Sequence, residues 1–239
     1  MSFTLETRQA EILRQLIELY IASAEPVSSK VLCERGGLDV SPATIRCELA
    51  GLEKAGFIRQ PHTSAGRVPT ELGYQYYLQH FLTQASPVAR ETLSLATQIR
   101  GAPDAEGAIK TLAKNLVALS GEMVVVALDP HVSYYTGVSN LLSKPDFQDI
   151  EALHAISSLV DRFDEVLTGM FHEVTDDPEV LIGSKNPFGE GMTSILIRYT
   201  NPDKTTGLLG IVGPLRMDYS KNMRLVREAK DALDQSSNL

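Results

Sequence analysis

A change of residue pattern along the chain constrains the fold more than any other feature of the sequence. Residues 1–83 place apolar side chains at helical spacing between clear helix-capping residues. Residues 121–213 instead contain short runs rich in β-branched side chains, such as MVVVAL and TSILIRYT. A chain of 239 residues is long enough for two small domains. We therefore predict a helical domain in 1–83, connecting helices in 84–120 and an α+β domain in 121–239.

Charge is divided unevenly between these parts. The chain has 22 Lys and Arg against 30 Asp and Glu, a net charge of -8, which excludes a uniformly basic, histone-like protein. Residues 1–83 hold 8 basic and 9 acidic side chains, so the remaining 14 basic and 21 acidic side chains give the rest of the chain a net charge of -7. Any contact with nucleic acid must therefore be local.

The sequence favours a folded cytoplasmic protein without a bound metal or cofactor. Its longest apolar run is the six residues 123–128, against the roughly 20 needed to cross a bilayer, and its N-terminus lacks the apolar stretch of a signal peptide. Cys33 and Cys47 are expected to be reduced. The five histidines show no metal-ligand spacing and no catalytic motif is present, so we do not expect an enzyme.

The N-terminal part begins with three predicted helices. The first covers residues 6–24, and Ser28 or Ser29 can cap a short second helix. Ser41, which is followed by Pro, is a strong start signal for a third helix that we expect to run to about residue 55.

The third helix has one predicted core face and one free face. Ile45, Leu49 and Leu52 recur at helical spacing and form the core face. The sides and back of the helix carry small residues with Arg and Lys: Ala43, Thr44, Arg46, Cys47, Ala50 and Lys54. Small side chains permit close approach to the major groove, where Arg can bond guanine. The pattern fits a helix-turn-helix, and equally an ordinary three-helix bundle with a solvated face.

A predicted hairpin with a polar tip favours the first interpretation. Two short strands are expected over 57–60 and 67–69, joined by a polar segment. Its polar groups suit phosphate contact or insertion of Arg into a narrow minor groove, and they belong to His62, Thr63, Ser64 and Arg67. Helix, turn, helix and hairpin together describe a winged helix. A fourth helix follows Thr70, with four expected apolar positions: Leu72, Tyr76, Leu78 and Phe81. Its three tyrosines are expected in a core or interface rather than stacked on bases.

The downstream part predicts helices around several strands. A helix over 104–120 has an apolar stripe of Ile109, Leu112, Leu116 and Leu119. The further expected elements are a strand over 123–128, a long helix over 147–171, strands over 179–182, 193–199 and 207–212, and a last helix over 219–233. Gly207, Gly210 and Gly213 lie along an expected strand, so they are not interpreted as a phosphate-binding loop.

The chain resembles the HrcA family, bacterial heat-shock repressors that bind the inverted-repeat CIRCE operator upstream of chaperone genes. EPVSSK, SPATIR and QPHTSAGRVPT occur in order at the family's spacing within residues 4–82, and IGSKNPF and GIVGPLRMDYSK are similar to its C-terminal motifs. The resemblance implies a winged helix followed by a GAF-like α+β domain, and a homodimer whose activity a GroEL-type chaperonin maintains. The residues expected to contact DNA are Ser29, Lys30, Ser41, Ala43, Thr44, Arg46, Cys47, Lys54, His62, Thr63, Ser64 and Arg67.

The resemblance has three departures. Position 47 is Cys where the family usually has Asn, which can bond adenine through two hydrogen bonds. Gly51 stands where an acidic residue is common, and inside a helix it costs about 1 kcal/mol relative to Ala. The family's inserted dimerisation segment is missing or minimal, so we expect dimerisation through helix 88–100 with 70–82, or through an open edge of the C-terminal sheet.

Other interpretations stay open at this point. The polar residues of the two C-terminal motifs can line a ligand pocket or fix the loop before the last helix, and the second role is favoured: Asn186, Arg216, Asp218 and Tyr219. A ligand pocket would fit a metabolite-responsive winged-helix regulator. A GAF-like protein-interaction module without DNA binding is the other alternative.

Overall fold

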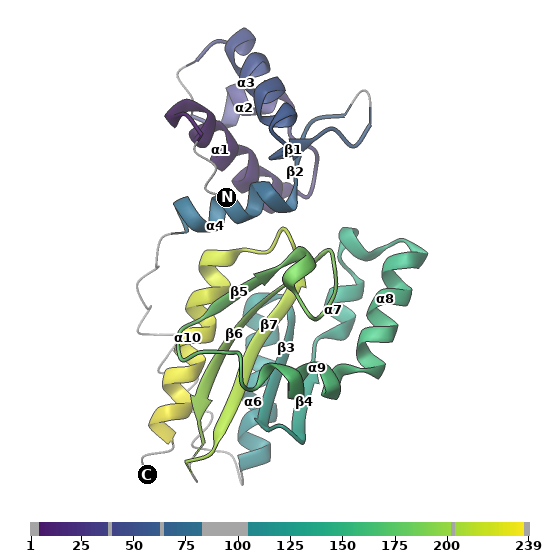
Figure 1. Ribbon diagram of the computed structural model, residues 1–239, viewed down its shortest axis with the longest axis vertical. Coiled ribbons are helices and arrows are strands. Elements are labelled where there is room, and N and C mark those ends of the chain that lie inside the picture. Colours follow the sequence, from purple (N-terminus) through teal and green to yellow (C-terminus); the bar gives the residue numbers. More distant parts are fainter. Residues whose placement is uncertain (1–4, 38–39, 63–64, 83–104, 202–203, 237–239) are drawn as a thin grey trace. The chain divides into compact units, whose positions relative to one another are not determined.

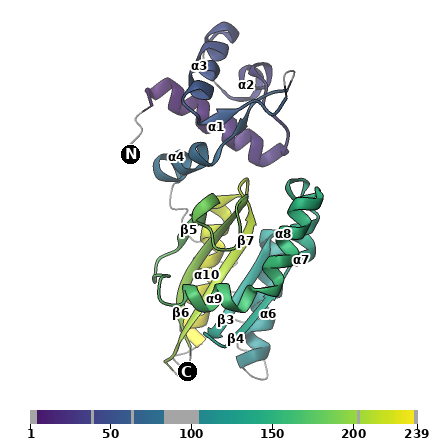
Figure 2. The same cartoon turned by 45° about the vertical axis from the view of Figure 1, so that its right-hand side comes forward.

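The computed structural model describes residues 5–37, 40–62, 65–82, 105–201 and 204–236. These residues belong to two compact units, Met1–Thr83 and Gln84–Leu239, which Figures 1 and 2 draw from two directions. The helix expected over 88–100 lies outside the described residues. Within the described part of the chain, no helix combines the length and apolar character needed to cross a membrane.

The described part of the first unit consists of helices and a short antiparallel hairpin. Its elements are α1 (Thr7–Ser23), α2 (Ser29–Arg35), α3 (Pro42–Lys54), β1 (Ile58–Arg59), β2 (Val68–Pro69) and α4 (Glu71–Phe81). Three helices begin after a hydroxyl side chain that accepts a hydrogen bond from the backbone N–H three residues further on, namely Ser28, Ser41 and Thr70. Ser28 is thus the cap of α2, rather than Ser29.

The core of this unit includes the face of α3 that was predicted to be buried, but on α4 the buried face differs from the predicted one. Ile45, Leu49 and Leu52 are buried. On α4 the buried aromatic residues are Tyr74, Tyr76 and Tyr77, whereas Leu72, Leu78 and Phe81 are only half-buried. Gly73 lies on the buried side of α4, where a Cβ would lie 2.2 Å from the carbonyl oxygen of Phe57. This glycine lets α4 lie close to the backbone just before β1, on the same side as the buried tyrosines.

The second unit is built on a five-stranded antiparallel sheet in the order β4-β3-β7-β6-β5. Its strands are β3 (Met123–Asp129), β4 (Val132–Thr136), β5 (Glu179–Ile182), β6 (Met192–Thr200) and β7 (Thr206–Pro214). Its helices are α6 (Ala105–Ser120), α7 (Val138–Leu142), α8 (Ile150–Asp161), α9 (Phe163–Met170) and α10 (Tyr219–Ser236), with short 3-10 turns η1 (Pro145–Phe147) and η2 (Gly183–Lys185).

Helices cover both faces of this sheet (Figure 2). α6 and α10 contact each other and the central strands on one face. On the other face Met123 and Val125 of β3 join a core that includes Phe163 of α9 and Ile156 of α8. Because β3 is buried on both faces, its sequence is a continuous apolar run rather than an alternating one. In α6 the predicted stripe is buried except for Leu119, which is exposed near the end of the helix.

The long helix expected over 147–171 is wrong in detail. Two helices, α8 and α9, are separated at Arg162, whose backbone leaves the helical region with φ -111° and ψ 14°. Buried residues continue at helical spacing across this break, at Ile156, Leu159, Phe163 and Leu167, so periodicity could not reveal it. β4 and α7 were also not predicted, since β4 is half-exposed and α7 has five residues.

The glycines of β7 are needed for packing. A Cβ at Gly207 would lie 2.3 Å from the ring of Tyr199, and one at Gly210 would lie 2.2 Å from Leu196 Cδ2. These contacts place the glycines against side chains of the neighbouring strand, as expected for strand residues rather than for a phosphate-binding loop.

Candidate nucleic-acid interface

The free face of α3 carries small and basic side chains. Its exposed residues are Ala43, Arg46, Cys47, Ala50 and Lys54, while Thr44 is half-buried. They lie opposite the buried face of the same helix because the core positions recur at helical spacing. Cys47 is a free thiol in the middle of this surface. Apart from Arg46 and Lys54, the exposed residues of α3 are small or compact, namely Pro42, Ala43, Cys47 and Ala50.

The two carboxylates on α3 are each paired with an arginine from another element. Glu48 Oε1 lies 2.5 Å from Nη2 of Arg8 on α1, and Glu53 Oε2 lies 3.0 Å from Nε of Arg67. Among the residues that the structure describes, neither Arg46 nor Lys54 has an acidic partner. The ion pairs offset the acidic charge of α3, so the exposed face keeps the field of its two cations.

Arg67 lies at the base of the hairpin, not at its tip. Its backbone exchanges two hydrogen bonds with Val27, of 2.8 and 2.9 Å. A Cβ on the preceding Gly66 would lie 2.5 Å from the carbonyl carbon of Val27, so only glycine permits this approach. Together with the Glu53 ion pair, these contacts hold the hairpin against both α3 and the segment before α2. The first role of Arg67 is therefore to position the hairpin.

A recess of about 390 Å³ lies where these elements meet. It is lined by Val27, Ser28, Ser29, Arg46, Leu49, Ala65, Gly66 and Arg67. Three of the predicted site residues, Ser29, Arg46 and Arg67, therefore come from three different elements to one concave surface. A recess lined by two arginines suits an anionic group such as a phosphate.

The remaining predicted residues divide into three groups. Ser41 accepts the backbone N–H of Thr44 at 3.1 Å, and the two hydroxyls lie 2.9 Å apart, so both take part in the cap of α3. Lys30 is exposed and 3.9 Å from Glu34, and His62 is exposed on the hairpin. Thr63 and Ser64 lie outside the described residues.

Sequence reasoning missed Arg59 as a further exposed cation of the hairpin. It lies on β1 with its side chain exposed, next to the buried Ile58. The signal that could have identified it is the alternation of side chains along a strand, which turns Arg59 outward once Ile58 faces the core.

The polar residues of the C-terminal motifs have structural partners in the second unit. Asn186 Oδ1 accepts hydrogen bonds from Ser194 Oγ at 3.0 Å and Phe188 N–H at 3.4 Å. The Tyr219 hydroxyl donates to the Leu215 carbonyl, and Asp218 caps the first turn of α10. These contacts fix the loops around β6 and α10, which agrees with the structural role that we favoured.

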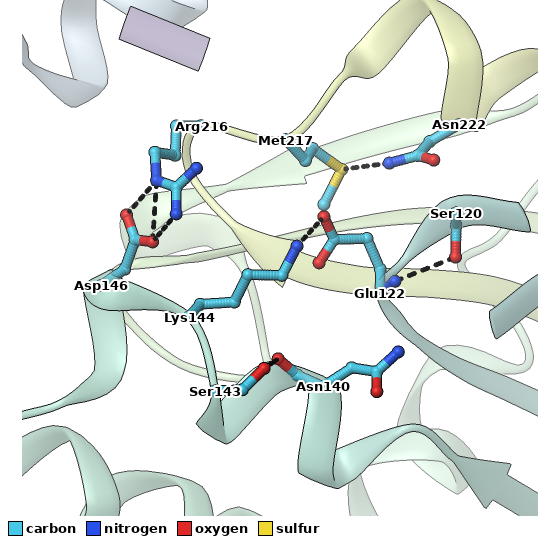
Figure 3. Close-up of polar contacts among 9 residues, drawn as sticks. All are labelled: Ser120, Glu122, Asn140, Ser143, Lys144, Asp146, Arg216, Met217 and Asn222. Atoms are coloured by element: carbon cyan, nitrogen blue, oxygen red, sulfur yellow. Dashed lines mark hydrogen bonds and ion pairs between the residues drawn. The ribbon is translucent and has the colours of Figure 1, made fainter. Parts of the chain in front are cut away.

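Arg216 belongs to a network of four charged side chains (Figure 3). Its Nη2 lies 2.7 Å from Asp146 Oδ2, and Lys144 Nζ lies 2.8 Å from Glu122 Oε1. Burial raises the pKa of Glu122 above its ordinary value, while the hydrogen bond from Lys144 acts in the opposite direction. The network ties the start of β3 to η1 and to the loop before α10. Within the described residues, no group of His, Cys, Asp and Glu side chains could hold a metal ion.

Both units resemble known proteins. The fold joins a small helical unit to an antiparallel α/β unit, and it matches a crystal structure described as a hypothetical protein at 2.2 Å resolution, with a TM-score of 0.74, 19% identity and 98% coverage of both chains. This match establishes a mixed α/β fold with an antiparallel sheet. The model of the HrcA protein C terminal domain matches residues 77–223, more than half of the chain. The chain belongs to the HrcA family.

Curated relatives agree with this assignment. The heat-inducible transcription repressor HrcA of Nocardioides sp. is 43% identical over 121 residues, which are 51% of this chain and 36% of that relative. The repressor of the same name from Desulforudis audaxviator is 26% identical over 327 residues, covering 93% of this chain and 95% of the relative. Because 327 exceeds the 239 residues of this chain, at least 88 aligned positions have no counterpart here. This chain is thus shorter than the relative that it matches.

Proposed function

We propose that the protein is a sequence-specific transcription repressor of heat-shock or chaperone genes. The observation that carries this proposal is the exposed face of α3, where Glu48 and Glu53 are paired with arginines from other elements and Arg46 and Lys54 remain toward solvent. In this proposal α1 to α4 and the hairpin form a winged helix, and α3 enters the major groove. The names of the HrcA relatives support the regulatory role.

The rest of the proposal follows from the family. The second unit is a GAF-like domain, and the protein acts in the bacterial cytosol as a homodimer on an inverted-repeat, CIRCE-like operator. A twofold operator requires a twofold protein, because each recognition helix contacts one half-site. A GroEL-type chaperonin would favour the active repressor. The acidic remainder of the chain would limit non-specific binding to DNA.

Arg46→Ala tests the role of α3. We expect it to weaken binding to the selected operator by about 1 to 3 kcal/mol and to reduce discrimination at one base pair. The matched control is Arg162→Ala, which removes an exposed arginine from the second unit and should leave operator binding unchanged. Fluorescence anisotropy on operator and scrambled duplexes measures both effects. Equal operator affinities for Arg46→Ala and the wild type would show that α3 does not contact the bases.

The same measurement separates the other interpretations. Absence of any salt-dependent DNA binding by the wild type would favour a protein-interaction module. Operator binding that responds to a small metabolite, and not to chaperonin, would favour a metabolite-responsive regulator.

A further inference from the structure

We propose that two copies of this chain associate through β4, so that the two five-stranded sheets join into one. The inference builds on the homodimer of the proposed function and names its surface. β4 is the last strand on one side of the sheet, and its residues Val132 to Thr136 are exposed or half-buried. Pairing with a second strand would satisfy the outward backbone N–H and C=O groups of β4.

The two edges of the sheet differ in how they are protected from pairing. An Asp-Pro pair precedes both edge strands, Asp129-Pro130 before β4 and Asp177-Pro178 before β5, but β5 also begins with the charged residue Glu179. A charged side chain on an edge strand is a common means of preventing edge-to-edge association. β4 consists of Val-Ser-Tyr-Tyr-Thr, which has neither charge nor proline and has high β propensity. Of these two edges, β4 is therefore the better suited to accept another strand.

The sequence of β4 is compatible with pairing to itself in the antiparallel direction. A twofold axis through Tyr134 would place Ser133 opposite Tyr135 of the second copy, and Val132 opposite Thr136. No like charges would face each other along the strands, because β4 has no charged residue. Aromatic and β-branched side chains directly opposite each other stabilise such pairs. The strand can therefore pair with β4 of a second copy of the chain.

The surface beside β4 is also self-complementary. A groove of about 280 Å³ runs between β4 and α6, lined by Glu106, Ile109, Lys110, Val126, Leu128, Val132, Ser133 and Tyr134. Tyr134 lies on this side, with Lys110 Nζ 5.9 Å from its ring centroid, and Lys110 also pairs with Glu106 at 2.5 Å. Adjacent acidic and basic side chains can exchange partners across a twofold axis. The groove offers space for an aromatic side chain of the second copy.

Val132→Lys tests the inference on the full chain. Val132 is 47% exposed, so the fold should tolerate the change, while lysine is a residue that naturally protects sheet edges. We expect the dimer dissociation constant to rise about tenfold or more, measured by analytical ultracentrifugation without DNA. The control is Ile150→Lys, on α8, where the wild-type side chain is 72% exposed. A wild-type monomer, an unchanged Val132→Lys dimer, or dissociation by Ile150→Lys would each overturn the inference.

A crosslink gives a second measurement. In a background of Cys33→Ser and Cys47→Ser, Tyr134→Cys should form a covalent dimer under mild oxidation, because directly opposite residues bring their Cβ atoms within about 5 Å. Leu153→Cys on α8 is the matched control and should stay uncrosslinked. Crosslinking of the Leu153 variant alone would place the interface on α8.

DNA binding distinguishes this inference from the proposed function. Val132→Lys should bind an isolated half-site as the wild type does, but lose affinity for the full inverted repeat. A wild type that dimerises through β4 without binding an inverted repeat would disprove the DNA-binding proposal and leave the interface standing. If the wild-type dimer binds the operator and Val132→Lys does not weaken that dimer, the DNA-binding proposal would stand and the β4 interface would be disproved.

Discussion

The guanidinium of Arg67 at the base of the hairpin lies 3.0 Å from the carboxylate of Glu53 on α3. Both side chains are partly exposed, with 25% and 34% of their surface accessible. The pair holds the hairpin to the proposed recognition helix and offsets an acidic charge on it. An exposed ion pair contributes little stability, so we expect its main effect on position and charge.

Glu53→Gln should increase the non-specific affinity for DNA. The change releases the charge of Arg67 for phosphate contact, so the slope of log affinity against log salt should steepen by about one. Anisotropy titrations of a scrambled duplex across a range of salt concentrations measure this slope. Glu25→Gln, which changes an exposed acid outside α3, is the control. The same slope for wild type and Glu53→Gln would mean that Arg67 does not contact phosphate.

Cys47→Asn should alter base preference. The exposed position of Cys47 on α3 allows an amide there to form two hydrogen bonds with adenine, worth about 1 to 3 kcal/mol of discrimination. Selection of binding sites from a random library should show a gain of adenine at one position of each half-site. Ala55→Asn places the same amide at the end of the helix and should leave the selected sites unchanged. An identical site for Cys47→Asn and wild type would refute this prediction.

Gly66→Ala should destabilise the protein. A Cβ would lie 2.6 Å from the Pro26 carbonyl oxygen and 2.5 Å from the Val27 carbonyl carbon, so the backbone pair of Val27 and Arg67 must separate. We expect a loss of about 1 to 3 kcal/mol in the free energy of unfolding, measured with urea. Gly169→Ala is the control, because no atom lies within 4 Å of its added Cβ and the position is helical. Equal stability of the Gly66 variant and wild type would contradict the prediction.

Glu122→Gln should change how stability depends on pH. Burial raises the pKa of Glu122 above 4.5 in the folded protein, so the folded state holds its proton more tightly than the unfolded chain. The contribution of this group is full below pH 4.5 and is lost as pH rises through the folded pKa. Relative to wild type, Glu122→Gln should therefore gain stability as pH rises from 4.5 to 7. Parallel urea denaturation curves at the two pH values check this, and a constant difference would rule it out.

Several features of the fold were predictable from the sequence because they depend on neighbours along the chain. Ser41 followed by Pro42 begins α3, and the spacing of Ile45, Leu49 and Leu52 identifies its buried face. A cap and a helical stripe each involve residues three to seven positions apart. Membership in the family was likewise visible in short motifs at fixed spacing.

Only the tertiary structure decided which groups meet across the chain. The partner of Arg67 and the position of β4 at a sheet edge depend on residues distant in sequence. The separation of α8 from α9 at Arg162 interrupts a run whose buried residues keep helical spacing, so the pattern did not reveal it. Ion pairs between elements and the order of strands leave no periodic pattern, since they arise from packing. The sequence by itself therefore determined where α3 begins and which side it buries, whereas packing decided that the acidic side chains on α3 are paired with arginines and that its exposed face is left basic.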